Sequence, residues 1–269
     1  QPSNILVSSK GILFISDLVP LGVLAKVPFG FIKGPVEGAN KNPVSDVSWR
    51  PRELIKAMAG ELATKLMSTA SDMQVAGMLI YYMLTGNHLF GKNDHECQTN
   101  ILRGRPILKP VNTELDDLVQ HLVTLEPEYR LSASKAVRHP VFWGPRKRLF
   151  FLSTVALEME RQHREWPSDD VLRQFESACK AFANWKDRFP PCVVTDTFAS
   201  EGSSVAILNL LSLTKRCALH YDSMSTEAQS YIKQPEKFFS ETFPGLLMAV
   251  HGVVRRTHWR HFPGIEVFF

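Results

Sequence analysis

Two short apolar runs near the start of the chain have the pattern of a β-hairpin. The runs are Ile5–Val7 and Ile12–Ile15, and the sequence Ser-Ser-Lys-Gly joins them. Apolar runs bounded by Ser and Gly predict two strands connected by a tight turn. Asn4 precedes the first run and Asp17 follows the second, so the two polar residues flank the predicted hairpin.

The second half of the chain has apolar residues at helical spacing. Such spacing, with charged residues between the apolar ones, predicts amphipathic helices. No alternating strand pattern interrupts this half, so we expect it to be helical throughout. The predicted helical segments are residues 144–166, 169–185, 204–220 and 235–256.

One of these segments, LLSLTKRCALH at 210–220, ends in a histidine. At about 100° per residue, its wheel places Asn209, Arg216 and His220 on one side. The opposite side is apolar and is expected to face the core. A histidine beside an arginine on a helix surface is most often a solvated pair, so the wheel alone assigns His220 no function. The predicted core-facing residues are Ile207, Leu208, Leu210, Leu211, Thr214 and Ala218.

The composition is that of a globular protein without a structural metal. Of the 269 residues, 44% are hydrophobic and 22% are charged, and the net charge of +4 is too small to require a nucleic-acid partner. The four cysteines form no CxxC pair, which argues against a zinc site or a disulfide framework and favours reduced thiols. The longest apolar stretch, residues 75–84, covers about half a membrane crossing. We expect no membrane contact from this segment itself.

The hairpin region resembles the catalytic and metal-binding loops of protein kinases. Gln1-Pro2-Ser3-Asn4-Ile5-Leu6 is similar to K-P-x-N-I-L, and Asp17-Leu18-Val19 is similar to D-F-G. In that family the Asn and the Asp hold the Mg²⁺ ions that bridge the ATP phosphates, because hard cations prefer oxygen ligands. The resemblance therefore implies that Asn4 and Asp17 would bind Mg²⁺ and ATP or ADP, but only in a complete kinase.

Three further segments extend this resemblance. VSDVSWRPREL at 44–54 is similar to G-W-x-A-P-E-L, with Glu53 as the acidic residue. SDMQVAG at 71–77 resembles the start of a buried helix, with Asp72 at the acidic position. Arg130 matches the arginine that pairs with the Glu53 equivalent in kinases. The resemblance implies structural roles for Glu53, Asp72 and Arg130.

Several kinase motifs have no counterpart in the chain. The Gly-rich loop, the V-A-I-K lysine and H-R-D are absent, since the sequence begins after their usual positions. Phosphoryl transfer requires the phosphates to be positioned between two lobes. We therefore expect the lower lobe of a kinase, either as a fragment or as a degenerate kinase.

The junction after this lobe resembles the unfolded-protein sensor kinase/endoribonucleases, the inositol-requiring enzyme family, and the related RNase L. HPVFW at 139–143 leads directly into a basic, apolar helix, and FFSETFPGLLMAV at 238–250 and WRHFP at 259–263 also match. The implied fold is mainly α. Residues 1–143 would form the C-terminal lobe of a kinase, which contains a short hairpin. An all-helical RNase domain of the KEN type follows at 144–269.

In this family the helical domain cleaves RNA without a metal, using a helix that reads L-L-x-x-[IM]-R-N-x-x-x-H. Aligned on LLSLTKRCALH, the Arg is Lys215, the Asn is Arg216 and the His is His220. A histidine with an ordinary pKa near 6.5 is able to protonate the leaving oxygen, and Lys or Arg is able to stabilise the developing charge. The family also places a Tyr before this helix, whereas residues 196–206 contain only Phe198 as an aromatic. Lysine also lacks the bidentate fork of arginine.

Family behaviour implies a homodimer or higher oligomer, an RNA stem-loop substrate and the cytosolic face of the endoplasmic reticulum, or the cytoplasm for this segment alone. One alternative is a pseudokinase–pseudoribonuclease that acts as a dimerisation or regulatory module. Another is a protein kinase proper. The basic-aromatic tail at 255–261 either binds RNA phosphates and stacks a base or is a solvated helix end. Arg146, Lys147 and Arg148 are expected to cap the junction rather than bind a ligand.

Overall fold

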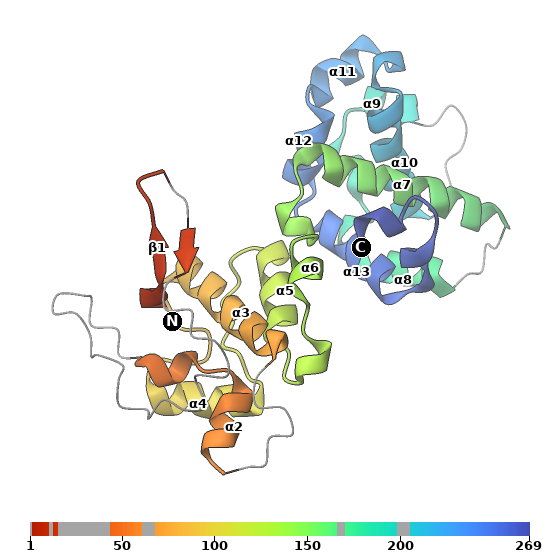
Figure 1. Ribbon diagram of the computed structural model, residues 1–269. Helices are drawn as coiled ribbons and strands as arrows, with labels where there is room; N and C mark the ends of the chain where they lie inside the picture. The colour runs from red at the N-terminus through yellow and green to blue at the C-terminus, as the bar shows by residue number, and fades with distance from the viewer. Residues whose placement is uncertain (1, 11–12, 16–43, 61–67, 166–169, 198–204) are drawn as a thin grey trace. The chain divides into compact units, whose positions relative to one another are not determined.

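The computed structural model describes residues 2–10, 13–15, 44–60, 68–165, 170–197 and 205–269. It divides the chain into two compact units, Gln1–Ala136 and Val137–Phe269 (Figure 1). The domain boundary expected at 143/144 lies seven residues after this division. Residues 137–143 fall in the second unit, and Trp143 is buried in that unit's core.

The first unit begins with the predicted hairpin. A short 3-10 helix, η1 (Pro2–Asn4), leads into β1 (Ile5–Val7), which pairs antiparallel with β2 (Leu13–Ile15). Ile5 lies opposite Ile15 and Val7 opposite Leu13. The hairpin prediction is therefore confirmed for the described strands, whereas Ile12 and Asp17 lie outside the described residues.

The other described residues of the first unit form helices and the segments that connect them. A core that includes Trp49, Met78, Tyr81, Phe90 and Ile101 holds its helices together. The helices are η2 (Asp46–Trp49), α2 (Arg52–Met58), α3 (Thr69–Thr85), α4 (Asp94–Arg103), α5 (Thr113–Leu122), η3 (Pro127–Tyr129) and α6 (Ala133–Ala136).

Gly77 allows α3 and the end of α5 to approach closely. A Cβ atom at this position would lie 2.7 Å from Val123 Cγ1 and 2.9 Å from Leu122 Cβ, which is closer than side-chain atoms pack. The glycine of the motif at 71–77 therefore has a packing role in this structure.

The second unit is built around two long helices that lie side by side, α7 (Pro145–Glu165) and α10 (Ala206–Leu219) (Figure 1). Its described residues contain helices and no strand, as the periodicity predicts. The other helices of this unit are η4 (Pro140–Phe142), α8 (Asp170–Ala178), η5 (Lys180–Phe182), η6 (Trp185–Arg188), α9 (Pro191–Thr197), η7 (Tyr221–Ser223), α11 (Thr226–Ile232), α12 (Pro235–Thr242), α13 (Leu246–Arg256), η8 (His258–His261) and η9 (Glu266–Phe268).

Two predicted helices are shorter than their patterns suggested. The segment 169–185 forms α8 only as far as Ala178, and two 3-10 turns follow. The segment 235–256 is divided into α12 and α13 at Pro244-Gly245, because proline disrupts helix hydrogen bonding and Gly245 adopts a left-handed φ of 89°.

Among the described residues, no helix is both long and apolar enough to cross a membrane. All four cysteines are free thiols, and Cys97, Cys179 and Cys217 are buried.

Candidate functional site

His220 lies immediately after the last residue of α10. Its backbone N–H donates to the carbonyl oxygen of Arg216 at 2.8 Å, so it closes the helix as the C-terminal cap. The side chain is exposed, as the wheel predicted. A ligand in solution therefore has access to this imidazole.

The wheel was wrong about Asn209, which is 4% exposed. Because α10 contacts α7, α8, α9 and α12, neighbouring helices cover more of its circumference than the predicted apolar face. Leu213 and Cys217 are also buried, although they were not among the predicted core-facing residues, and Ala218, which was, is only half-buried. Arg216 and His220 remain at the surface side of the helix.

Lys215 points to a carboxylate on the neighbouring helix α7. Its Nζ donates to Glu160 Oε1 at 2.6 Å and also contacts Oε2. Ser212 Oγ donates to the same Oε1 at 2.7 Å. Both charged side chains of this pair are more than two-thirds buried. The charge of Lys215 is therefore already balanced by a structural partner, and sequence spacing alone gave no sign of Glu160.

Arg216 has a different environment from its neighbour Lys215. Among the described residues it forms no ion pair or hydrogen bond through its guanidinium group, and its Nε atom is buried. Arg216 also lies one helical turn before His220, at the i, i+4 spacing that places two side chains on one face. A cation and an accessible imidazole therefore share the end of α10.

Tyr221 follows His220 directly, and the sequence interpretation overlooked it. Its hydroxyl donates to the carbonyl oxygen of Gln229 at 2.8 Å. Burial, with the neighbouring Cys217 and Asp222, raises the pKa of the Tyr221 phenol. A neutral phenol engaged with the main chain is a poor proton acceptor, so Tyr221 does not replace the tyrosine expected before α10. Phe198, in the segment that carries that position, lies outside the described residues.

The basic-aromatic tail contains no exposed tryptophan. Trp259 is fully buried and packs 4.9 Å from the Phe175 ring. The alternative in which this ring stacks a nucleotide base is therefore excluded, because the ring belongs to the hydrophobic core. The basic side chains around it remain accessible to solvent.

The three basic residues at the start of α7 interact mainly with nearby groups. Arg148 Nε donates to the Trp143 carbonyl oxygen at 2.8 Å, and its Nη2 donates to that of Pro140 at 3.2 Å. Lys147 Nζ lies 4.8 Å from the centre of the Trp143 ring. Arg146 lies 3.4 Å from Glu236. The capping expectation holds most clearly for Arg148.

The kinase-like residues are only partly placed. Asn4 ends η1 and is half-buried, and Asp17 lies outside the described residues. Asp72 is exposed in the first turn of α3, where a carboxylate complements the helix dipole.

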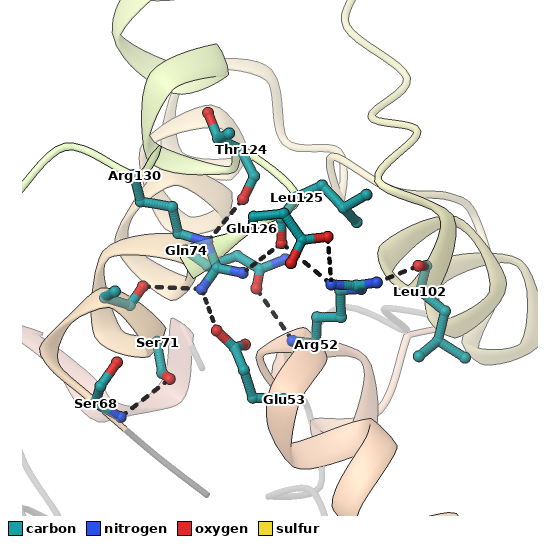
Figure 2. A network of polar contacts seen from close by, with 11 residues as sticks. Arg52, Glu53, Ser68, Ser71, Gln74, Leu102, Thr124, Leu125, Glu126 and Arg130 are labelled. Carbon is teal, nitrogen blue, oxygen red and sulfur yellow. Dashed lines mark hydrogen bonds and ion pairs between the residues drawn. The ribbon is translucent and has the colours of Figure 1, made fainter. Parts of the chain in front are cut away.

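Glu53 and Arg130 form the expected ion pair in the first unit. Arg130 Nη1 donates to Glu53 Oε1 at 2.7 Å and to the carbonyl oxygen of Ala70 at 3.0 Å. The other nitrogens of Arg130 donate to the carbonyl oxygens of Thr124 and Leu125. Figure 2 shows how this one guanidinium joins α2, α3 and the segment after α5. The pair is structural in its geometry.

Arg52 forms a second, more exposed set of contacts beside this pair (Figure 2). Its Nη1 donates to Glu126 Oε1 at 3.2 Å, and its Nε donates to the carbonyl oxygen of Leu102. The backbone N–H of Arg52 donates to the Gln74 side chain.

Comparison with known families agrees with the two units. A protein kinase domain family matches residues 1–142, and the ribonuclease 2-5A family matches residues 148–265. The kinase match covers more than half of the chain.

Three relatives illustrate the similarity of this chain to known proteins. Two are named as kinase/endoribonucleases and one as a sensor for unfolded proteins. The serine/threonine-protein kinase/endoribonuclease IRE2 of Homo sapiens is 29% identical over 95% of this chain and 28% of its own length. The serine/threonine-protein kinase/endoribonuclease ireA of Aspergillus fumigatus is 30% identical over 69% of this chain and 19% of its own. The sensor for unfolded proteins in the ER ire1 of Schizosaccharomyces pombe is 28% identical over 70% and 19%, respectively.

The chain thus spans between 19% and 28% of the length of these relatives. Within that span the kinase match comes first and the ribonuclease match follows it. The chain belongs to the serine/threonine-protein kinase/endoribonuclease family.

Proposed function

We propose that the second unit is a metal-independent endoribonuclease that cleaves RNA stem-loops. The observation that carries this proposal is the pairing, at the end of α10, of an exposed His220 with an Arg216 that has no carboxylate partner among the described residues. The match of residues 148–265 to the ribonuclease 2-5A family supports the choice of RNA as substrate.

In the proposed reaction, the RNA 2′-oxygen forms a bond to the adjacent phosphorus while the bond from phosphorus to the 5′-oxygen breaks. His220 acts as the general acid and donates its proton to the leaving 5′-oxygen. Arg216 stabilises the negative charge that develops on the phosphoryl oxygens. Because residues 196–206 contain no tyrosine, the 2′-hydroxyl proton passes to water, and we expect slow turnover.

Lys215 and Arg216 were both candidates for the cation. The wheel places Arg216 on the same side as His220, and the contacts of the two residues also favour Arg216. Glu160 balances the charge of Lys215, and moving Lys215 to a phosphate would leave that carboxylate half-buried without its partner. Arg216 has no such partner to lose. Lys215 therefore contributes to packing between α7 and α10, with a smaller role in the chemistry.

The test of the proposed acid is the His220→Ala variant in a cleavage assay with a labelled RNA stem-loop. We expect its rate to fall about 100-fold, the lower end of the usual contribution of a general acid. His95→Ala is the matched control, because His95 is also exposed but lies on α4 of the first unit. Equal residual cleavage by the wild type and the His220→Ala variant would sink the enzymatic proposal.

A second prediction separates the two cations. Arg216→Gln should lower the cleavage rate about 10-fold, because a solvent-accessible donor stabilises charge less than a fully enclosed one. Lys215→Gln should change the rate less and lower the midpoint of urea unfolding of the second unit instead. The measurement pairs initial rates with an unfolding curve for each variant. A larger rate loss in Lys215→Gln than in Arg216→Gln would reverse the assignment.

The second candidate function is a regulatory module, a pseudokinase–pseudoribonuclease that dimerises with an active relative. The absence of a tyrosine at 196–206 and the engagement of Tyr221 with the main chain favour it. This candidate predicts that purified protein cleaves no RNA but changes the cleavage rate of an active relative when the two are mixed. Sedimentation of the mixture tests for the required association.

For the complete kinase, we propose ATP or ADP with Mg²⁺ as cofactors and a homodimer or higher oligomer as the active state. The amide oxygen of Asn4 and the carboxylate of Asp17 are the donor types that Mg²⁺ prefers, and they are the residues that would hold it. The metal would neutralise charge on the nucleotide phosphates. The printed names of the relatives also lead us to propose the unfolded protein response and the cytosolic face of the endoplasmic reticulum as its setting.

A further inference from the structure

The C-terminal part of the second unit carries an exposed group of basic residues with no acidic neighbour in sequence. Between Glu241 and Glu266 the chain contains no Asp or Glu. We define the C-terminal basic patch as the exposed residues of this stretch, Arg256, His258, Arg260 and His261. They occupy the last turn of α13 and the 3-10 helix η8.

The patch is attached to a rigid part of the unit. The apolar residues of α13, including Val250, Val253 and Val254, are buried, and Trp259 fixes η8 in the core. Because Gly252 has no side chain, the guanidinium of Arg256 lies close to the helix, and a Cβ there would be 3.3 Å from its Nη1. The basic groups are therefore held on one continuous segment rather than on a free tail.

Most other arginines on this unit are already engaged. Arg161 pairs with Glu158 at 2.5 Å, Arg173 pairs with Asp170, and Arg146 lies near Glu236. Within the described part of the chain, by contrast, no residue of the patch contacts a carboxylate. Arg260 Nε donates to His261 Nε2 at 2.9 Å, which leaves the two terminal nitrogens of its guanidinium available. The patch thus presents uncompensated positive charge.

The surroundings of these basic residues favour the phosphate backbone of a nucleic acid as the partner, over unpaired bases or a membrane surface. Single-stranded nucleic acid is usually held by exposed aromatic rings on which bases stack, and membrane surfaces are held by exposed apolar side chains. Trp259 is fully buried, and the apolar face of α13 is in the core, so the patch offers no exposed tryptophan to a base and α13 offers no apolar face to a membrane. Its exposed arginines are suited to contact phosphates irrespective of base sequence.

We propose that the C-terminal basic patch binds the phosphate backbone of the base-paired stem of the RNA, in addition to the cleavage site at His220. This inference rests on the proposed ribonuclease function for its choice of RNA. The patch would contribute affinity and orientation, with no role in bond breaking. Its recognition would be independent of sequence and sensitive to salt.

The test uses the whole chain with His220→Ala, so that bound RNA stays intact, and a fluorescently labelled stem-loop. Arg256→Gln/Arg260→Gln should weaken RNA binding about 10-fold at about 50 mM salt. The slope of log affinity against log salt concentration should become shallower by about 2, as expected for the loss of two phosphate contacts. The matched control is Arg164→Gln/Lys180→Gln, which removes the same charge from exposed positions elsewhere on the unit. The control should bind within about 2-fold of the parent, since a non-specific charge effect is small and screened.

Equal weakening by the two double variants would overturn the proposal, because it would show an effect of net charge alone. Vesicles with 30% phosphatidylserine provide the alternative partner, and patch-dependent binding to vesicles without patch-dependent binding to RNA would also overturn it. Failure of the ribonuclease proposal is seen separately, as equal cleavage by the wild type and His220→Ala. The patch proposal survives that failure if RNA binding still depends on Arg256 and Arg260.

Discussion

Replacing Arg130 with methionine should lower the free energy of unfolding of the first unit by about 3–5 kcal/mol, the usual cost of breaking a buried ion pair. The Arg130 side chain is fully buried and donates to Glu53 Oε1, whereas the buried Glu53 Oε2 has no hydrogen-bond partner. The variant removes this donor from the Glu53 carboxylate and from the carbonyl oxygens of Ala70 and Thr124, and the carbonyl oxygen of Leu125 keeps only Arg52 Nη1 at 3.5 Å. The effect is large because the guanidinium satisfies groups from three segments at once.

Two further variants show whether the ion pair is the cause. Glu53→Gln/Arg130→Met removes both charges, so it should recover about 1–2 kcal/mol of the unfolding free energy lost in Arg130→Met, while the main-chain carbonyl oxygens stay unpaired in both variants. Arg52→Met is the matched control, because its partner Glu126 is about half exposed and a solvated pair contributes about 1 kcal/mol or less. If Arg52→Met proved as destabilising as Arg130→Met, burial of the pair would not explain the result.

Thiol labelling measures these changes unit by unit. Cys97 is buried in the core of the first unit and Cys217 in that of the second. After equilibration in urea, a brief pulse of a thiol reagent modifies only cysteines that unfolding has exposed, and mass spectrometry separates their peptides. The Cys97 transition should move with Arg130→Met by the predicted amount, while Cys217 reports the second unit in the same samples.

Much of the fold was predictable because its signals are local. The hairpin followed from two apolar runs and a turn, and α7 followed from periodicity that begins directly at a proline. The predicted segment at 235–256 missed its interruption because apolar spacing continues on both sides of Pro244-Gly245. A wheel records which residues share a face, and it does not record how many neighbouring helices surround that face. Asn209 was misplaced for this reason.

The candidate site was predictable only in part, since its decisive contacts join residues distant in sequence. The family motif pointed to Lys215, Arg216 and His220. The wheel placed Arg216 on the side of His220, but it gave no sign that Glu160, 55 positions before Lys215 in the chain, balances the charge of Lys215. Trp259 gave a misleading signal, because a tryptophan among basic residues suits both a nucleic-acid surface and a core anchor. Its burial is a property of the packing of α8 against α13, which no local pattern encodes.

Stability of the first unit should fall by about 2 kcal/mol between pH 7 and pH 5, and by about 3 kcal/mol by pH 4, because of His88. Burial lowers the pKa of His88 to about 4, although the Ser48 backbone and Asp94 act in the opposite direction. His88 Nδ1 accepts a hydrogen bond from the Phe90 N–H and lies 3.1 Å from Cys97 Sγ. His88 binds a proton near pH 6.5 in the unfolded chain but only near pH 4 in the folded chain. The contribution of neutral His88 to stability is therefore complete above about pH 6.5 and is lost as the pH falls from there towards about 4.

The comparison of His88→Gln with the wild type isolates this contribution. Glutamine retains an acceptor for the Phe90 N–H but does not titrate, so the variant should lose about 2 kcal/mol less than the wild type between pH 7 and pH 5. His95→Gln is the control, because His95 is exposed on α4 of the same unit and should leave the pH dependence unchanged. Urea titrations at each pH, followed by a labelling pulse at pH 7, give the Cys97 transition for all three proteins. Parallel pH profiles for the wild type and His88→Gln would show that protonation of His88 does not control the acid sensitivity of this unit.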